Sequence, residues 1–173
     1  MKKTYYLLLF VVLLPAAVRA QTGWITKKLD EKVSVKFPAE PQKVSKSGID
    51  TYTFKAKDST GYNTAVIDYQ VVAHLDSATL APMKDSQEFA DQMKMGIASK
   101  KPNYTFGEVT IGKWKTYTTY QFSGTENTTK NTVSVQMILI GSKMYVLTCL
   151  VPSGLTTPNK EVFLSSAELL NRG

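Results

Sequence analysis

The sequence predicts an α+β domain built around an antiparallel β-sheet of about six to seven strands. Most segments alternate apolar and polar residues with the period of two that is typical of strands, and two segments change to the period of a helix. Residues 144–151 are apolar on both faces, which is typical of a central strand covered on both sides. The order of strands, helix, four consecutive strands and helix favours antiparallel pairing with helices packed on the sheet.

Residues 131–151 form the hairpin around which the chain is organised. Its strands, 131–140 and 143–151, are joined by Gly141 and Ser142, and the glycine supplies the positive φ of a type II′ turn. Apolar side chains alternate to both sides of the second strand. They are Tyr145, Leu147, Cys149 and Val151 on one face, and Met144, Val146 and Leu150 on the other. We therefore expect this strand to lie in the middle of the sheet.

The first twenty residues have the composition of a secretory signal peptide. Lys2 and Lys3 precede an apolar run at 5–14, and small residues then lead to a cleavage site after Ala20. A retained membrane anchor is the alternative, but the run is shorter than the roughly 20 residues that span a bilayer. We expect residues 1–20 to be removed, and residues 21–173 to form a single periplasmic or secreted domain with no transmembrane segment.

The expected mature chain has the size and charge of one ordinary domain. Without Lys2, Lys3 and Arg19 it carries 18 Lys and Arg residues against 14 Asp and Glu residues, a net charge of +4. Its lysines are scattered and Arg172 is its one arginine, which disfavours nucleic acid as a partner because nucleic acid selects a clustered basic surface. Cys149 is the single cysteine, so a disulfide within the chain is not possible.

Three strands are predicted in the first part of the mature chain. A short element at 24–29 precedes an alternating, half-buried strand at 33–37, which two prolines end. Alternation returns at 51–57 and again at 65–71. The cluster Asp-Ser-Thr-Gly at 58–61 is typical of a turn, so we expect these two strands to form a hairpin.

The middle of the chain changes to the period of a helix. Its apolar stripe consists of Phe89, Met93 and Ile97. We expect a helix from about residue 86 to residue 100, with Asp85 as its N-cap and Glu88 completing a capping box. Residues 76–84 are expected to add a turn or a short helix before it.

The last third of the chain is predicted to be a four-strand meander followed by a helix. Strands at 104–111 and 114–122 flank a turn at Gly112 and Lys113, and a polar loop at 124–130 leads into the hairpin of 131–151. The final helix is expected to begin at Asn159. Its buried face would contain Val162, Phe163, Ser166, Ala167 and Leu170.

The sequence contains no recognisable catalytic, cofactor-binding or metal-binding site. His74 is the single histidine, and Asp76 beside it could orient a general base, but no hydrolase motif accompanies the pair, so we expect a strand-end polar residue. Cys149 lies in an apolar strand and is expected to be a core residue and not a nucleophile. The acidic pair Asp30 and Glu31 lacks the spacing of a calcium loop.

Three segments resemble the PsbP-like superfamily. They are VSVKFPAEP at 33–41, KMYVLTCLVPSG at 143–154 and EVFLSS at 161–166, since members have a Y-V-L-T central strand leading into an F-L-x-S helix. The resemblance implies an α/β/α sandwich, with helices on both faces of an antiparallel sheet. The superfamily includes photosystem II extrinsic subunits and a Ran-binding nuclear transport factor, and its members are mostly binding or assembly proteins. No functional residue carries over, so neither photosynthesis nor Ran binding is implied for this chain.

Three functions remain open at this point. The first is a small exported non-enzymatic binding or accessory protein that contacts a protein or a component of the cell envelope. The second is a carrier of a small apolar ligand held between helix and sheet, which the methionines and aromatic residues permit. The third is a hydrolase that uses His74 with a distant acid. A large apolar cavity would favour the second function, and polar groups converging on His74 would favour the third.

Overall fold

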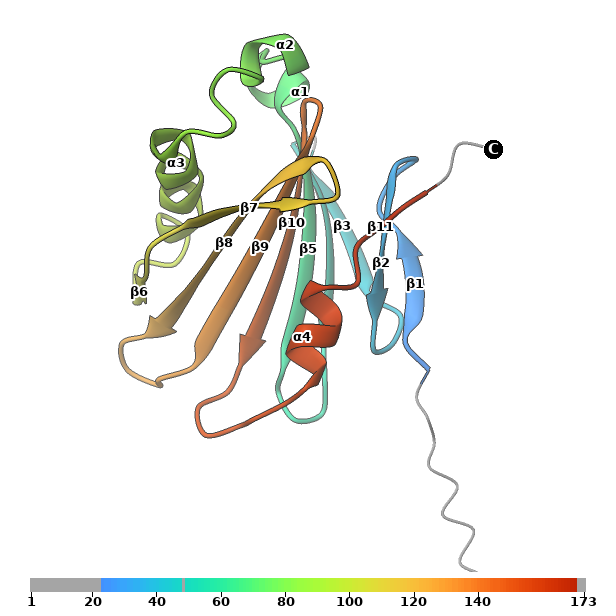
Figure 1. The fold of residues 1–173 in the computed structure, drawn as a ribbon. Coiled ribbons are helices and arrows are strands. Elements are labelled where there is room, and N and C mark those ends of the chain that lie inside the picture. The colour runs from blue at the N-terminus through green and yellow to red at the C-terminus, as the bar shows by residue number, and fades with distance from the viewer. Residues whose placement is uncertain (1–22, 48, 171–173) are drawn as a thin grey trace, which may run out of the picture.

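The computed structural model describes residues 23–47 and 49–170. The expected signal peptide, residues 1–20, lies outside these residues. Within the described chain there are an eight-stranded antiparallel sheet, a three-stranded sheet and four short helices (Figure 1). No helix in this part of the chain has the length and the apolar character needed to cross a membrane.

The large sheet has more strands than the six to seven predicted. Seven strands follow the order β3-β4-β5-β10-β9-β8-β6, and β7 is the eighth, paired with β8. They are β3 (Gln42–Lys46), β4 (Ile49–Lys55), β5 (Gly61–Asp68), β6 (Tyr104–Phe106), β7 (Thr110–Trp114), β8 (Tyr117–Glu126), β9 (Thr132–Ile140) and β10 (Lys143–Val151). The strands β7 to β10 form the predicted meander, although β8 extends to Glu126 and shortens the loop expected at 124–130.

β10 lies between β5 and β9, as its apolar pattern predicts. Tyr145 pairs with Val66 on one side and with Ile138 on the other. Between β9 and β10, Gly141 has a φ of +64°, in the left-handed region that glycine enters without steric penalty. The prediction of a central strand reached through a glycine turn is therefore confirmed.

One hydrophobic core fills the space between the large sheet and the small one. The small sheet has the order β1-β2-β11, and its strands are β1 (Ile25–Lys28), β2 (Val33–Phe37) and β11 (Glu168–Leu169). Phe37 of β2 contacts Phe163 of α4 (Asn159–Leu164) edge-to-face, with ring centroids 5.3 Å apart. Both rings belong to the core that contains Tyr145, Leu147 and Cys149 of β10.

A second core lies on the opposite face of the large sheet, against α2 (Ser77–Leu80) and α3 (Gln87–Ala98). Leu80 of α2 and Phe89 of α3 pack there with Met144 and Val146 of β10. Figure 1 shows α3 and the small sheet on opposite sides of the large sheet. Each core thus receives a side chain from a helix, but the small sheet supplies much of the layer that covers the first face.

The strand predicted at 65–71 ends earlier, at Asp68. The Asp68 carboxylate accepts a hydrogen bond from the Gln70 N–H at 3.0 Å and caps the one-turn helix α1 (Tyr69–Ala73). The prediction of strand for Tyr69 and Val71 is therefore wrong, because apolar alternation continues by coincidence into the helix. The β4–β5 hairpin itself is confirmed.

The predicted central helix is present as α3, but its cap differs from the prediction. The Ser86 hydroxyl accepts a hydrogen bond from the Phe89 N–H at 3.2 Å, so Ser86 and not Asp85 is the N-cap. Asp85 instead accepts hydrogen bonds from Lys113 Nζ at 2.7 Å and from Thr118 Oγ1 at 2.8 Å. These two partners come from the β7–β8 hairpin, which sequence spacing alone does not place beside the helix. The short helix α2 agrees with the expectation for 76–84.

Residues 104–111 form two strands and not the single strand predicted. The break at 107–109 places Val109 in the second core, and β6 and β7 then pair with successive parts of β8. The following turn falls at Lys115, which has a φ of +55°. Gly112 lies within β7 opposite Thr119, so the turn predicted at Gly112 and Lys113 is wrong.

The last helix is shorter than predicted. Pro158 occupies the N-cap position of α4 without a side-chain hydrogen bond, and Asn159 is the first residue inside the helix. Ser166 and Ala167 are buried but lie beyond the end of α4, in the segment that leads to β11. Val162, which was expected on the buried face, is 42% exposed.

Candidate functional site

An open, mostly apolar groove of about 340 Å³ lies between the end of α3 and the part of the large sheet formed by β4, β5 and β10. Side chains from one face of the sheet line its floor in rows that follow the strand register. The rows are Ile49 with Ile67, then Thr51 with Ala65 and Val146, then Thr53 with Asn63 and Thr148. Ile97, the last residue of the apolar stripe of α3, lines the groove from the helix side.

The floor changes from apolar to polar along the strands. Ile67 pairs with Met144, next to the β9–β10 turn, so this end of the floor is hydrocarbon. The third row carries two hydroxyl groups and one amide. There the Asn63 side-chain N–H donates to the Thr53 hydroxyl at 2.9 Å. Leu150 and Gly61 lie beyond this row, so the polar groups occupy the part of the floor away from the β9–β10 turn, and we call this part the polar end.

A smaller hollow of about 120 Å³ continues the groove along α3. The two hollows share four lining residues, which are Ile67, Ile97, Lys100 and Val146. The smaller one is further lined by Met93 and Gly96 of α3 and by Met137 and Met144 of the sheet. The apolar surface is thus continuous from the sheet to the space beside the helix.

The charged residues among the described lining of the groove are Lys100 and Lys101, which follow α3. Neither forms an ion pair with a carboxylate of the described chain. Lys101 Nζ lies 4.9 Å from the ring centroid of Tyr104, a distance at which cation–π attraction holds the ammonium group. Tyr104 begins β6 and pairs with Glu126 at the end of β8, so Lys101 lies toward the polar end of the floor. Lys100 lines the groove and also the smaller hollow beside α3.

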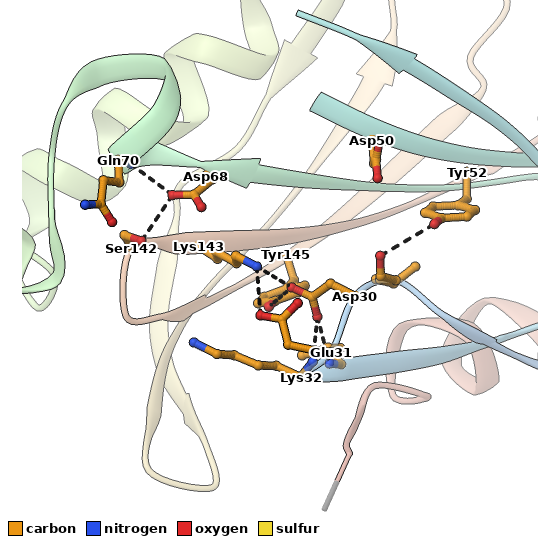
Figure 2. A network of polar contacts seen from close by, with 12 residues as sticks. Asp30, Glu31, Lys32, Asp50, Tyr52, Asp68, Gln70, Ser142, Lys143 and Tyr145 are labelled. Carbon is orange, nitrogen blue, oxygen red and sulfur yellow. Dashed lines mark hydrogen bonds and ion pairs between the residues drawn. The ribbon is translucent and has the colours of Figure 1, made fainter. Parts of the chain in front are cut away.

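A network of polar side chains joins the two sheets elsewhere in the molecule (Figure 2). Lys143 Nζ lies 3.0 Å from Asp30 Oδ2 and 3.0 Å from Glu31 Oε1. The Tyr145 hydroxyl donates to the same Asp30 oxygen at 2.6 Å. The other Asp30 oxygen accepts hydrogen bonds from the backbone N–H groups of Lys32, in the β1–β2 loop, and of Val33, the first residue of β2, at 2.8 and 3.1 Å.

Hydrogen bonding decides the charge of this network. Burial disfavours the ionised form of Asp30, but donors from Tyr145, the backbone and Lys143 outweigh it and lower the pKa of Asp30. Burial and the hydrogen bond to Asp30 raise the pKa of Tyr145. Burial alone would lower the pKa of Lys143, yet the carboxylates of Asp30 and Glu31 raise it. Because every partner is engaged in holding the loop, we interpret the network as a structural clamp and not as a reactive site.

The described structure does not assemble a catalytic group around His74. The residue is exposed, follows α1 with a φ of +56°, and its backbone N–H donates to the Tyr69 carbonyl. Asp76, the neighbour that could orient the imidazole, instead caps α2 by accepting a hydrogen bond from the Thr79 N–H at 2.8 Å. That bond also lowers the pKa of Asp76. His74 therefore follows a short helix, where a strand end had been expected.

Cys149 is a core residue, as its place in an apolar strand predicts. The side chain is fully buried in the core between the two sheets. Burial raises the pKa of the thiol to about 12, so the thiolate that a nucleophile needs is scarce at neutral pH.

The groove is a feature that sequence reasoning missed. Its lining comes from three strands and the end of a helix, which lie far apart in the chain. One feature of the sequence could have indicated the groove. Thr51, Thr53 and Thr148 lie on the face of the sheet that α3 covers, and a face that is completely covered would carry aliphatic residues at these positions. In the described ranges, no three His, Cys, Asp or Glu side chains gather as a metal site would require.

Comparison with known proteins identifies the fold. No family model matches the sequence, and no curated protein matches it. The structure is similar to cyanobacterial PsbP (CyanoP) from Synechocystis sp. PCC 6803, with a TM-score of 0.56 and 9% identity, over 83% of this chain and 90% of that chain. A crystal structure from Bacteroides thetaiotaomicron VPI-5482 aligns with a TM-score of 0.47 and 12% identity, over 81% of this chain and 46% of that one, so this chain spans about half its length. The similarity to CyanoP establishes a PsbP-like fold, which the three sequence segments predict.

Proposed function

We propose that this protein is a small exported binding or accessory protein of the cell envelope, which acts by binding at the groove beside α3. The observation that carries the proposal is the groove itself. Its volume of about 340 Å³ falls within the size range of about 300–1,000 Å³ that is usual for ligand sites. An apolar floor with a few polar groups at one end is also the usual composition of such sites.

Three further parts of the proposal rest on the sequence, the layering and the surroundings of His74. Export rests on the signal-like composition of residues 1–20, with cleavage after Ala20 and a mature domain at 21–173. The α/β/α description rests on Phe163 of α4 packing in one core and Leu80 and Phe89 of α2 and α3 packing in the other. A non-enzymatic role is supported by the exposure of His74 and by the engagement of Asp76 in a helix cap.

Binding of a small apolar ligand is the second candidate, and a specific observation favours it over a protein partner. Protein interfaces are extended surfaces of about 800 Å² per partner, whereas this site is a concave hollow that narrows beside α3. The hydrolase hypothesis has no comparable observation in its favour.

The proposal is tested by blocking the groove. Ala65 is half-buried in the floor, and Ala65→Trp should fill the space between Thr51 and Val146. Ala73 is exposed on α1 and does not line the groove, so Ala73→Trp is the matched control. Each protein is incubated with an envelope extract, repurified and measured by native mass spectrometry. We expect a bound mass on wild type and Ala73→Trp that is lost from Ala65→Trp, and a bound mass equal on all three would contradict the groove as the site.

A further inference from the structure

We propose that the groove binds a single-chain amphiphile with an anionic head, of the fatty-acid class. In this proposal the chain lies along the apolar end of the floor and the head lies beside Lys100 and Lys101. The inference rests on the proposed function, because it names the ligand class of the same groove. Three observations lead to it: the gradient of the floor, the size of the hollow and the charge of its rim.

The gradient of the floor matches the two parts of an amphiphile. Ile49, Ile67 and Met144 lie side by side in register at the apolar end. Thr53, Asn63 and Thr148 lie side by side at the polar end, two rows of outward-facing residues further along. A wholly apolar ligand would displace water from the polar row, in which Asn63 and Thr53 are hydrogen-bonded to each other, and a wholly polar ligand would leave the hydrocarbon row exposed to water.

The size of the hollow fits one chain of medium length. A methylene occupies about as much space as a water molecule, whose share of liquid volume is about 30 Å³. The groove of about 340 Å³ therefore accommodates about ten such groups. The smaller hollow, lined by Met93, Met137 and Met144, receives the end of a longer chain, and methionine side chains adapt readily to irregular ligands.

The rim supplies the charge that selects an anion. Both charged residues among the described lining are lysines, and no described carboxylate neutralises either one by an ion pair. Lys100 lines the groove and the smaller hollow, whereas Lys101 lines the groove alone and lies over the Tyr104 ring. A carboxylate between them would gain charge-assisted hydrogen bonds at the polar end of the floor.

The experiment uses purified protein from residue 21 onward and measures affinity by isothermal titration calorimetry with four probes: decanoate, octanoate, hexanoate and 1-decanol. We expect decanoate to bind, and each methylene removed to weaken binding by about fourfold, the value for a buried methylene. We expect 1-decanol to bind about tenfold more weakly than decanoate, because it lacks the anion. Equal affinity for decanoate and 1-decanol, or for decanoate and hexanoate, would overturn the proposal.

Charge variants test the rim separately from the floor. K100E/K101E should weaken decanoate binding by about tenfold or more, and leave 1-decanol binding unchanged. K28E/K115E is the matched control, since both residues are exposed lysines outside the groove and the change in net charge is the same. K100Q/K101Q removes the charges without reversing them and should make decanoate and 1-decanol equal. Control and test variants that bind decanoate equally would refute a role for the lysines.

Two outcomes assign the groove to another occupant. A dimer of the wild type that Ala65→Trp dissociates, seen by light scattering, would give the groove to a second copy and overturn the proposal. A bound protein in the envelope-extract experiment, with no decanoate binding, would leave the proposed binding function standing and refute the ligand class. Absence of any groove-dependent ligand in both experiments would refute both.

Discussion

At the residue scale, the hydrogen bond from Tyr145 to Asp30 is a strong single contact between the two sheets. It joins a hydroxyl in a fully buried side chain to a carboxylate that is 13% exposed, at 2.6 Å. Hydrogen bonds to charged groups contribute about 1.5–3 kcal/mol. This contact thus contributes a substantial part of the small free energy of unfolding that is usual for a domain of this size.

Tyr145→Phe should lower the free energy of unfolding by about 2 kcal/mol at pH 7. Since the pKa of Asp30 is lowered in the folded state, the clamp stabilises the protein above the unfolded pKa of about 3.9. That stability is lost as the pH falls through the folded pKa. The difference between wild type and Tyr145→Phe, measured by urea denaturation, should therefore shrink below about pH 4. A difference that persists unchanged at pH 2 would contradict the clamp, and the half-exposed Tyr117→Phe is a control expected to change stability by less than about 0.5 kcal/mol.

The same substitution at two glycines should have opposite effects. A Cβ at Gly96 in α3 meets no atom within 4 Å, so Gly96→Ala should stabilise the protein by about 0.5–1 kcal/mol through helix propensity. A Cβ at Gly124 in β8 would lie 2.6 Å from the Phe106 ring, so Gly124→Ala should destabilise by about 1–3 kcal/mol. Thermal unfolding of both variants decides the matter, and a shift in the same direction would show that the two environments are wrongly described.

Burial of Cys149 should also slow its reaction with thiol reagents. A thiol reagent should label it slowly in the native protein and rapidly in denaturant, because the side chain is fully buried and its pKa is raised to about 12. Cys149→Ala should destabilise by about 1 kcal/mol, since little volume is lost. Rapid labelling of the native protein would reopen the interpretation of Cys149 as a nucleophile.

At the element scale, the start of α3 depends on one hydroxyl. Ser86→Ala removes the acceptor for the Phe89 N–H and should lower stability by about 1 kcal/mol, whereas Ser86→Asp should keep the cap and most of the stability. Urea denaturation of both variants measures this. If the two variants lose equal stability, the loss does not come from the cap.

The elements that the sequence predicts well are those whose pattern is set by burial. The β9–β10 hairpin and α3 have strong apolar periodicity, and both are found where expected. β3 was not predicted, because all five of its residues are exposed and no alternation marks it. The break between β6 and β7 was missed because Val109 is buried although it lies in the loop between them. A buried apolar residue in a loop continues the alternation of the flanking strands, so the sequence does not mark the break.

The candidate site could be predicted less completely than the fold. Each row of its floor joins residues from β4, β5 and β10, and the rim comes from the residues after α3. Which strands become neighbours depends on topology, and β5 reaches β10 only across a separation of about half the chain. Residue patterns therefore place Thr51 and Thr148 on strands, but they do not bring the two side chains to one groove.

At the scale of the whole molecule, the proposed export makes a direct prediction. Native protein purified from cells should begin at Gln21 and be found outside the cytoplasm. N-terminal sequencing after fractionation measures this, and Ala20→Arg, which disrupts the cleavage site, should retain the longer precursor. An intact Met1 on a cytosolic protein would refute export and with it a role in the cell envelope.

The pairing of β2 with β11 has a consequence for the timing of folding. It places Ser34 opposite Glu168 and Val33 opposite Leu169, and Phe163 lies in the same core as Phe37. A chain that emerges from a ribosome or an export channel N-terminus first cannot close this core until residues 163–169 have emerged. During export the polypeptide would therefore remain open enough to thread through a narrow passage until almost all of it has crossed, and it would lock into its final form only on the far side.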